Sequence, residues 1–179
     1  MRKWNAIISA AVLVLFILHA VLGSLQLTGL GHTVLKPLAW IMVGLIAVHV
    51  ILSTILTVGS LRVWRRTGTA YFRENRLFWA RRISGFAILV LIFFHLTAFG
   101  HTVEGIYRLR VFDAARLTTQ LLLVAAVAVH IITNIKPMLI SFGIRALRPR
   151  AADILFFLSV LLLIAAAAFI LYSLRWSAV

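Results

Sequence analysis

Hydrophobic residues occur along this chain in five long, unbroken runs that are separated by short polar segments. A helix needs about 20 apolar residues to cross the roughly 30 Å of hydrocarbon in a bilayer. None of the runs alternates apolar and polar positions with a period of two, so helices are favoured over barrel strands. The pattern predicts an all-α fold, a single integral membrane domain over residues 1–179, with five transmembrane helices at about 6–27, 34–58, 83–102, 115–137 and 154–174.

The composition supports this interpretation. Hydrophobic residues make up 63% of the 179 residues and charged residues only 12%. A water-soluble domain of this length has too little interior to bury so much apolar surface. The chain has no cysteine, which excludes disulfides and any thiolate or iron–sulfur site held by this chain alone. The first apolar run is too long for a cleavable signal peptide, so none is expected.

The basic residues indicate how the helices are oriented. The net charge is +14, and most of it lies in three segments: Arg2 and Lys3, the arginine-rich connection 61–82, and the group Arg145, Arg148 and Arg150. In a five-span chain these segments fall on one side, which the positive-inside rule assigns to the cytoplasm. We therefore expect a multi-pass protein of a bacterial inner membrane, with its N-terminus cytoplasmic and its C-terminus outside, and no nucleic-acid partner.

Four of the predicted helices contain one histidine each: His19, His49, His95 and His130. Ionisable groups at membrane depth are costly and usually mark function. With a rise of 1.5 Å per residue, His19 and His95 fall at a similar depth in the outer half, and His49 and His130 at a deeper level. The sequence therefore predicts an outer pair, His19 with His95, and an inner pair, His49 with His130.

Two imidazoles that face each other in a helical bundle can bind a haem iron from both sides. Four helices would then hold two stacked haem layers, with two haem b groups per chain. A single buried histidine is more often a hydrogen-bonded structural group, and that alternative stays open for each residue alone. Zinc or di-iron centres are less suitable, because they need carboxylates or cysteines that these spans lack. His101 is six residues from His95 and therefore faces another direction.

The histidine-bearing segments also repeat. The sequence "AVHVI" (47–51) returns as "AVHII" (128–132), and "LVLFILHA" (13–20) is similar to "LVLIFFHL" (89–96). The first two helices and the next two thus look like two copies of one hairpin, and the fifth helix is an addition.

One segment resembles a known family. "RRISGFAILVLIFFHL" (81–96) contains an R-x-S-G sequence followed eleven residues after its serine by an in-membrane histidine. It resembles the membrane anchors of the succinate dehydrogenase and fumarate reductase (succinate:quinone oxidoreductase) family, and the five spans with four histidines resemble the dihaem cytochrome b type of that family. The resemblance covers most of the chain as architecture and about sixteen residues as motif.

The resemblance implies that the four histidines are axial ligands to haem iron. It also implies a cytoplasmic iron–sulfur subunit bound to a flavoprotein subunit, and a membrane quinone, expected to be menaquinone, as electron donor or acceptor. Arg82 and Ser84 occupy positions that resemble quinone-contacting residues of the family; the alternative is a basic flank and a helix N-terminal cap.

Further candidates come from the residues themselves. Arg62 and Arg81 could pair with haem propionates, because guanidinium matches carboxylate geometry; otherwise they set topology and dock an acidic partner. On the outer side His32, His101 and Glu104 could bind quinol and take up its protons. Alternatively these are ordinary residues at headgroup level.

The sequence predicts an electron-transfer subunit of an oxidoreductase complex, not catalytic alone, because it contains no nucleotide-binding or cluster motif. Two alternatives stay open. One is the dihaem cytochrome b of a hydrogenase or formate dehydrogenase, which would meet its partner at the outer face. The other is a non-redox membrane scaffold or transporter, which would be colourless.

Overall fold

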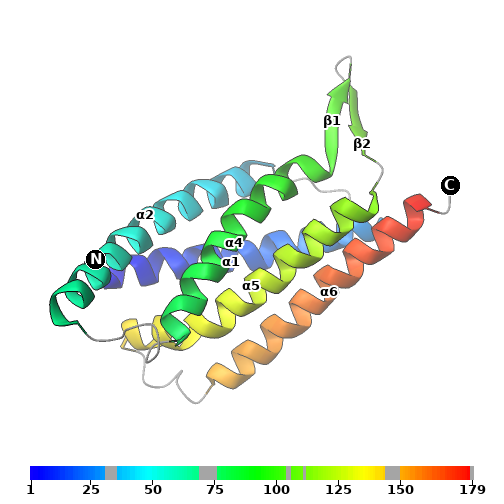
Figure 1. Ribbon diagram of the computed structural model, residues 1–179. Coiled ribbons are helices and arrows are strands. Elements are labelled where there is room, and N and C mark those ends of the chain that lie inside the picture. Colours follow the sequence, from blue (N-terminus) through cyan, green and yellow to red (C-terminus); the bar gives the residue numbers. More distant parts are fainter. Residues whose placement is uncertain (31–35, 69–75, 104–105, 111, 144–149, 178–179) are drawn as a thin grey trace.

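The computed structural model describes residues 1–30, 36–68, 76–103, 106–110, 112–143 and 150–177. It contains five long helices and one short hairpin: α1 (Arg2–Thr28), α2 (Lys36–Thr67), α4 (Arg76–Ala98), β1 (Gly100–Val103), β2 (Ile106–Leu109), α5 (Ala114–Ser141) and α6 (Ala151–Ser177) (Figure 1). All five helices are long and apolar enough to cross a membrane. The helical multi-pass architecture that the hydrophobic pattern predicted is therefore present.

The five helices form an open ring of neighbours. Along this ring α2 packs against α1, α1 against α6, α6 against α5, and α5 against α4; α1 also contacts α5, so that α6 lies against both of these helices. The N-terminus lies at one end of the bundle, and the β-hairpin and the end of α6 lie at the other (Figure 1). We call these the N-terminal end and the hairpin end. Large apolar side chains such as Phe156 and Leu163 on α6 are 73% and 70% exposed, as expected for surfaces that face lipid.

Glycines with a left-handed backbone follow three of the helices, α1, α2 and α5. The backbone of Gly29 is left-handed (φ 79°), its N–H donates to the carbonyl of Gln26, and the next N–H, of Leu30, donates to that of Leu25. This pattern satisfies carbonyls that the last turn of α1 leaves unpaired. Gly68 also has a positive φ (63°) directly after α2.

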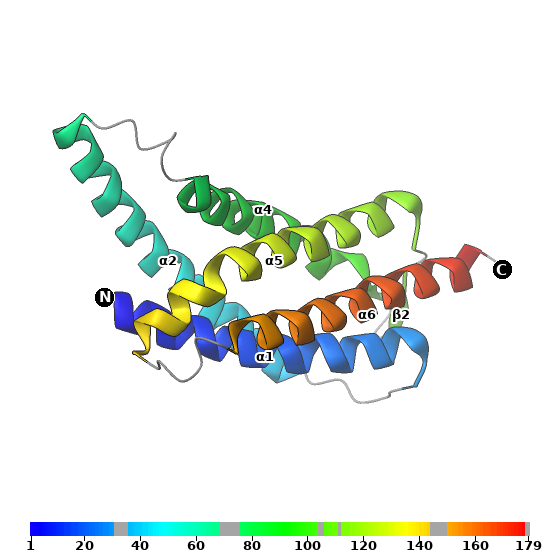
Figure 2. The same cartoon turned by 90° about the horizontal axis from the view of Figure 1, so that it is seen from below.

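Helix α2 extends beyond the predicted span. It has 32 residues, about 48 Å at 1.5 Å per residue, whereas the hydrocarbon is about 30 Å thick. Its C-terminal part, with Arg62, Arg65 and Arg66, runs away from the other helices (Figure 2). Arginine and leucine favour helix and no proline interrupts residues 59–67, so the helix continues past the apolar run.

The third span differs from the prediction at both ends. We expected a helix over 83–102, but α4 begins at Arg76 and ends at Ala98, and Gly100–Val103 forms a strand. This strand pairs antiparallel with β2, with Gly100 opposite Leu109 and His101 opposite Arg108. Gly100 is a poor helix former, and the β-branched and aromatic residues that follow favour a strand. His101 therefore lies on the hairpin and not on a helix.

Proline 137 does not end α5, although the predicted span stopped there. The helix continues to Ser141. A proline has no N–H, so the carbonyl of Thr133, four residues earlier, loses its helical donor. The Nε–H of Arg81 on α4 donates to this carbonyl instead, at 2.8 Å. The side chain thus compensates for the proline and links the two helices.

We expect Arg81→Met to lower the free energy of unfolding by about 1–3 kcal/mol, because it leaves a carbonyl inside the bundle without a donor. In a Pro137→Ala background the same change should cost much less, since the N–H of alanine 137 can donate to Thr133. Thermal unfolding of the four proteins in detergent gives the coupling. Arg76→Met, at the exposed start of α4, is the control. Equal losses in both backgrounds would contradict this explanation.

Candidate functional site

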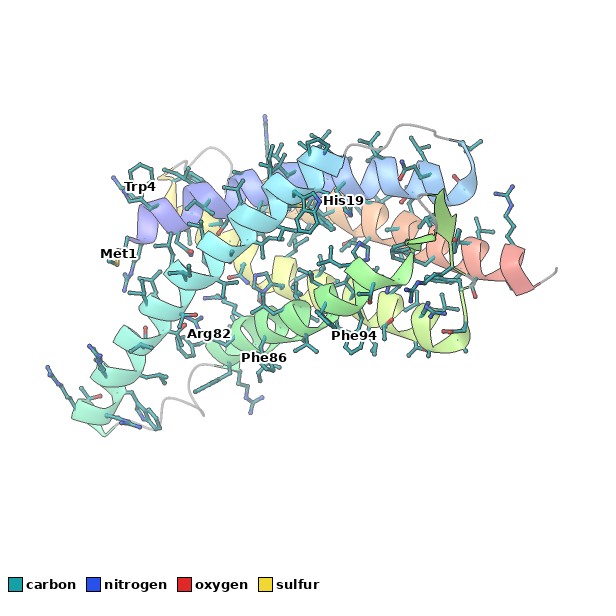
Figure 3. The ribbon with its side chains drawn as sticks, turned by 90° about the horizontal axis from the view of Figure 1, so that it is seen from above. Met1, Trp4, His19, Arg82, Phe86 and Phe94 are labelled. Carbon is teal, nitrogen blue, oxygen red and sulfur yellow. The ribbon has the colours of Figure 1, made fainter. Side chains whose placement is uncertain are left out.

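The structure brings the four in-membrane histidines together in two pairs, as the depth argument predicted. The ring centres of His19 and His95 are 5.9 Å apart, with an angle of 72° between the ring planes. Those of His49 and His130 are 6.3 Å apart, with an angle of 89°. His19 projects from α1 towards α2 and α4 (Figure 3). On the outward face of α4, Phe86 and Phe94 are 69% and 47% exposed.

Each pair joins two helices that are not closely packed neighbours. His19 and His95 come from α1 and α4, and His49 and His130 from α2 and α5. Within the part of the chain that the structure describes, neither α1 with α4 nor α2 with α5 is among the closely packed helix pairs. The imidazoles therefore reach towards each other across the interior of the open ring.

The separation of the rings fits a shared metal ion. A metal–imidazole bond is about 2 Å long and the ring centre lies about 1 Å behind the bonding nitrogen, so two imidazoles on opposite sides of one metal have centres about 6 Å apart. Both pairs match this value. No cluster of three or more His, Cys, Asp or Glu side chains suited to a metal ion is found among the described residues. A group at either pair would thus need further ligands of its own, as a porphyrin iron has.

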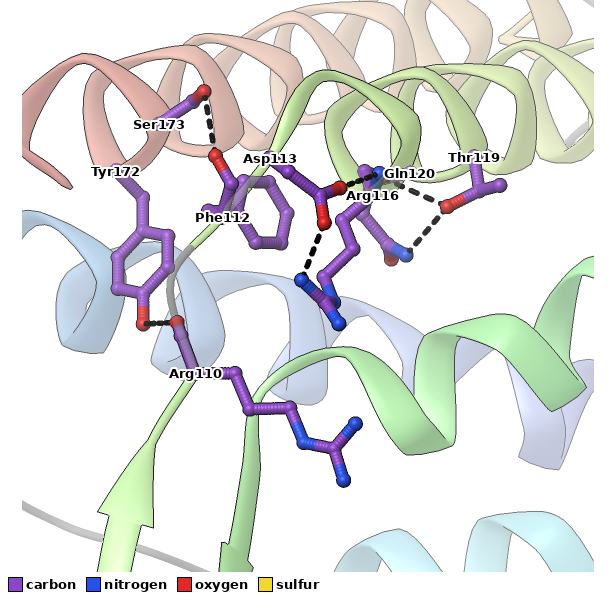
Figure 4. A network of polar contacts seen from close by, with 8 residues as sticks. All are labelled: Arg110, Phe112, Asp113, Arg116, Thr119, Gln120, Tyr172 and Ser173. Carbon is purple, nitrogen blue, oxygen red and sulfur yellow. Dashed lines mark hydrogen bonds and ion pairs between the residues drawn. The ribbon is translucent and has the colours of Figure 1, made fainter. Parts of the chain in front are cut away.

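Hydrogen bonds at Nδ1 orient three of the four rings. His95 Nδ1 lies 2.7 Å from Oε1 of Gln120, a side chain with no exposed surface. An amide oxygen only accepts, so Nδ1 carries the proton and donates it. The Gln120 amide nitrogen in turn donates to the hydroxyl of Thr119 at 3.3 Å (Figure 4). This arrangement leaves Nε2 of His95 as the basic nitrogen.

The inner pair has serines in the same role. The hydroxyl of Ser9 donates to the carbonyl of Asn5 (2.7 Å), which leaves its oxygen to accept from Nδ1 of His49 at 3.1 Å. Likewise Ser84 donates to the carbonyl of Arg81 (3.2 Å) and accepts from Nδ1 of His130 at 3.1 Å. Partners of this kind fix the tautomer and raise the basicity of a histidine ligand. Ser53 lies 3.5 Å from Nε2 of His49, but its hydroxyl donates to Oδ1 of Asn5.

Each orienting side chain lies on the same helix as a histidine of the other pair. Ser9 and His19 lie on α1, Ser84 and His95 on α4, and Gln120 and His130 on α5. The members of each couple are ten or eleven residues apart, about 15 Å along a helix axis. Three helices thus give the same spacing between the two histidine pairs, about half of the hydrocarbon thickness.

The R-x-S-G segment lies against His130. Ser84 is buried and bonded to that ring, and a Cβ on Gly85 would lie 3.3 Å from its Cε1, so glycine lets the imidazole approach α4 closely. Arg82 donates from Nε to the hydroxyl of Thr57 on α2 at 3.1 Å, and its guanidinium lies 3.7 Å from the centre of the Phe78 ring. Arg82 therefore bridges the two helices at the ends of the open ring.

The other predicted site residues lie elsewhere or outside the described part. Arg62 is exposed on the projecting part of α2, and Arg81 uses its Nε for Thr133. His101 is on β1, whereas His32 and Glu104 lie outside the described residues. The prediction that these residues bind propionates or quinol stays a prediction.

Sequence reasoning missed Gln120, Ser9 and the aromatic cluster beside the outer pair. The ring of Phe99 lies 5.2 Å from that of His95, and it stacks with Phe112 and Phe169 at the hairpin end. The signal for Gln120 was present, because an amide within an apolar span needs a partner. Its distance of ten residues from His130 would have placed it at the level of His95.

Comparisons with protein-family models, with curated proteins and with solved structures found no match to this chain.

Proposed function

We propose that this chain is a dihaem cytochrome b of a membrane, with one haem b held by His19 and His95 and a second by His49 and His130. The observation that supports this most is the ring spacing. Both pairs lie at the distance that two imidazoles need on either side of one iron, on helices that are not closely packed neighbours within the described residues. A purely structural role for the histidines gives no reason for two such pairs.

When bound, haem b would supply reversible one-electron redox chemistry at each level. The chain's own residues hold and tune it. Gln120, Ser9 and Ser84 keep the Nδ1 protons of three ligands, so that Nε2 is the nitrogen available to iron. The two levels, about 15 Å apart along the helices, span the interior between one leaflet and the other.

In this proposal the chain is the membrane-anchor subunit of a complex of the succinate dehydrogenase or fumarate reductase type. It would exchange electrons between a membrane quinone and an iron–sulfur and flavoprotein partner. The N-terminal end would face the cytoplasm, where Arg62, Arg65 and Arg66 on the projecting end of α2 offer a basic surface to an acidic partner. Ser84, bonded to His130, would position that histidine as a haem ligand. Arg82, the arginine of the R-x-S-G segment, is the residue of this segment proposed to contact the quinone.

The test is a visible spectrum of the protein purified in detergent from haem-replete cells, oxidised and then reduced with dithionite. We expect the split or broad α-band of bis-histidine haem b and about two haems per chain. A colourless preparation would overturn the proposal and favour a non-redox scaffold or transporter. The side on which the soluble partner docks distinguishes this complex from a hydrogenase or formate dehydrogenase, whose partner would bind the hairpin end.

A further inference from the structure

Arginine 110 occupies a fixed position beside the outer histidine pair. Its backbone N–H donates to the carbonyl of Phe99 (3.2 Å), and the carbonyl of Arg110 accepts from the hydroxyl of Tyr172 (3.4 Å). The ring of Phe99 is in turn 5.2 Å from the ring of His95. Arg110, directly after β2, is therefore held next to Phe99, and Figure 4 shows its carbonyl bonded to Tyr172.

The Nε–H group of the Arg110 side chain is buried but has no hydrogen-bond acceptor among the described residues. Leaving a donor of a charged group unpaired away from water is costly, and buried donors in proteins are nearly always bonded. The guanidinium extends away from Tyr172 (Figure 4).

The neighbouring carboxylate does not serve this purpose. Asp113 caps α5 by accepting from the backbone N–H of Arg116 at 2.8 Å, and it also pairs with the Arg116 guanidinium at 2.6 Å. Two arginines six residues apart thus differ: Arg116 has its carboxylate within the chain, and Arg110 has a buried donor without one. An external carboxylate would complete it, because the guanidinium fork matches that geometry.

We propose that Arg110 binds a carboxylate of the group held between His19 and His95, which, given the proposed function on which this rests, is a propionate of the outer haem. The interaction places the propionate edge of that haem towards the hairpin end. It also neutralises a negative charge that would otherwise face an apolar cluster. The proposal concerns the outer haem alone, since Arg110 is bonded to Phe99, whose ring borders His95.

The experiment compares Arg110→Gln with Arg116→Gln, a control at the same end that removes the same charge. Haem transfer from each purified cytochrome to apomyoglobin is followed, and both midpoint potentials are titrated. In Arg110→Gln we expect one haem to leave about tenfold faster, as for the loss of one charged hydrogen bond. The same haem should have a lower midpoint potential. Without the Arg110 cation the negative charge of the propionate is uncompensated, and this charge stabilises the more positive ferric form. The second haem and the control should be unchanged.

A third variant, Arg110→Lys, keeps the charge but not the fork; it should restore the potential and still release the outer haem faster than wild type. This variant also answers the question if Arg110→Gln does not fold. Unchanged haem transfer in both variants, equal effects on both haems, or the same effect in Arg116→Gln would each overturn the inference while leaving a dihaem protein intact. A wild-type protein without haem would instead overturn the proposed function itself.

Discussion

A His130→Ala variant should retain about one haem per chain, and a His95→Ala variant should retain the other one. In the proposed arrangement each histidine supplies one of two axial bonds to its iron, so removing one imidazole weakens the binding of that haem and leaves the other site intact. The two variants should therefore differ in the midpoint potential of the haem that is left. Haem content by pyridine haemochrome and a redox titration of the α-band measure both quantities.

The pairing of the rings also predicts which variants should behave alike. His49→Ala should resemble His130→Ala, and His19→Ala should resemble His95→Ala, because the rings of each pair lie together and in the proposed function hold one haem. A double variant within a pair should lose no more haem than either single variant, whereas a double variant across the pairs should lose both haems. Leu163→Ala on the exposed face of α6 is the control. Loss of the same haem from His95→Ala and His130→Ala would contradict the pairing.

Much of this arrangement could be predicted from the sequence, because membrane helices obey few and strong constraints. The apolar runs gave the number of helices, and the rise per residue was enough to sort His19 with His95 and His49 with His130 by depth. The bilayer fixes the axial position of a residue on a spanning helix. Depth alone therefore predicted which rings meet, without knowledge of the helix neighbours.

Hydropathy could not predict what depends on lateral packing or on single backbone groups. The end of α4 at Ala98 depends on Gly100 and on the pairing of β1 with β2, and a strand pair of four residues leaves little trace in an apolar window. The continuation of α5 past Pro137 depends on Arg81, which lies 56 residues earlier in the chain. The partner of a lone carbonyl becomes visible only when helices are placed side by side.

The orienting residues are the sharpest test of how the two levels are built, because each acts on the level opposite to the histidine of its own helix. Ser84 shares α4 with His95 but bonds His130, and Gln120 shares α5 with His130 but bonds His95. We expect Ser84→Ala to weaken the haem that His130→Ala removes, and Gln120→Leu to weaken the haem that His95→Ala removes. The expected loss is about 10- to 100-fold in haem affinity, as for other partners of metal-bound histidines.

The same two variants should raise the midpoint potential of the haem they affect. An acceptor at Nδ1 makes the imidazole a stronger donor to iron and favours the ferric state, so its removal favours the ferrous state. Thr118→Val and Ser159→Ala are matched controls, since both hydroxyls are exposed and bond only within their own helices. Haem transfer and redox titration of the four proteins assign each effect to one level. If Ser84→Ala acted on the His95 haem, the crossed arrangement would be wrong, and the polar residues of α4 and α5 would serve the packing of their own helices rather than the ligands of their neighbours.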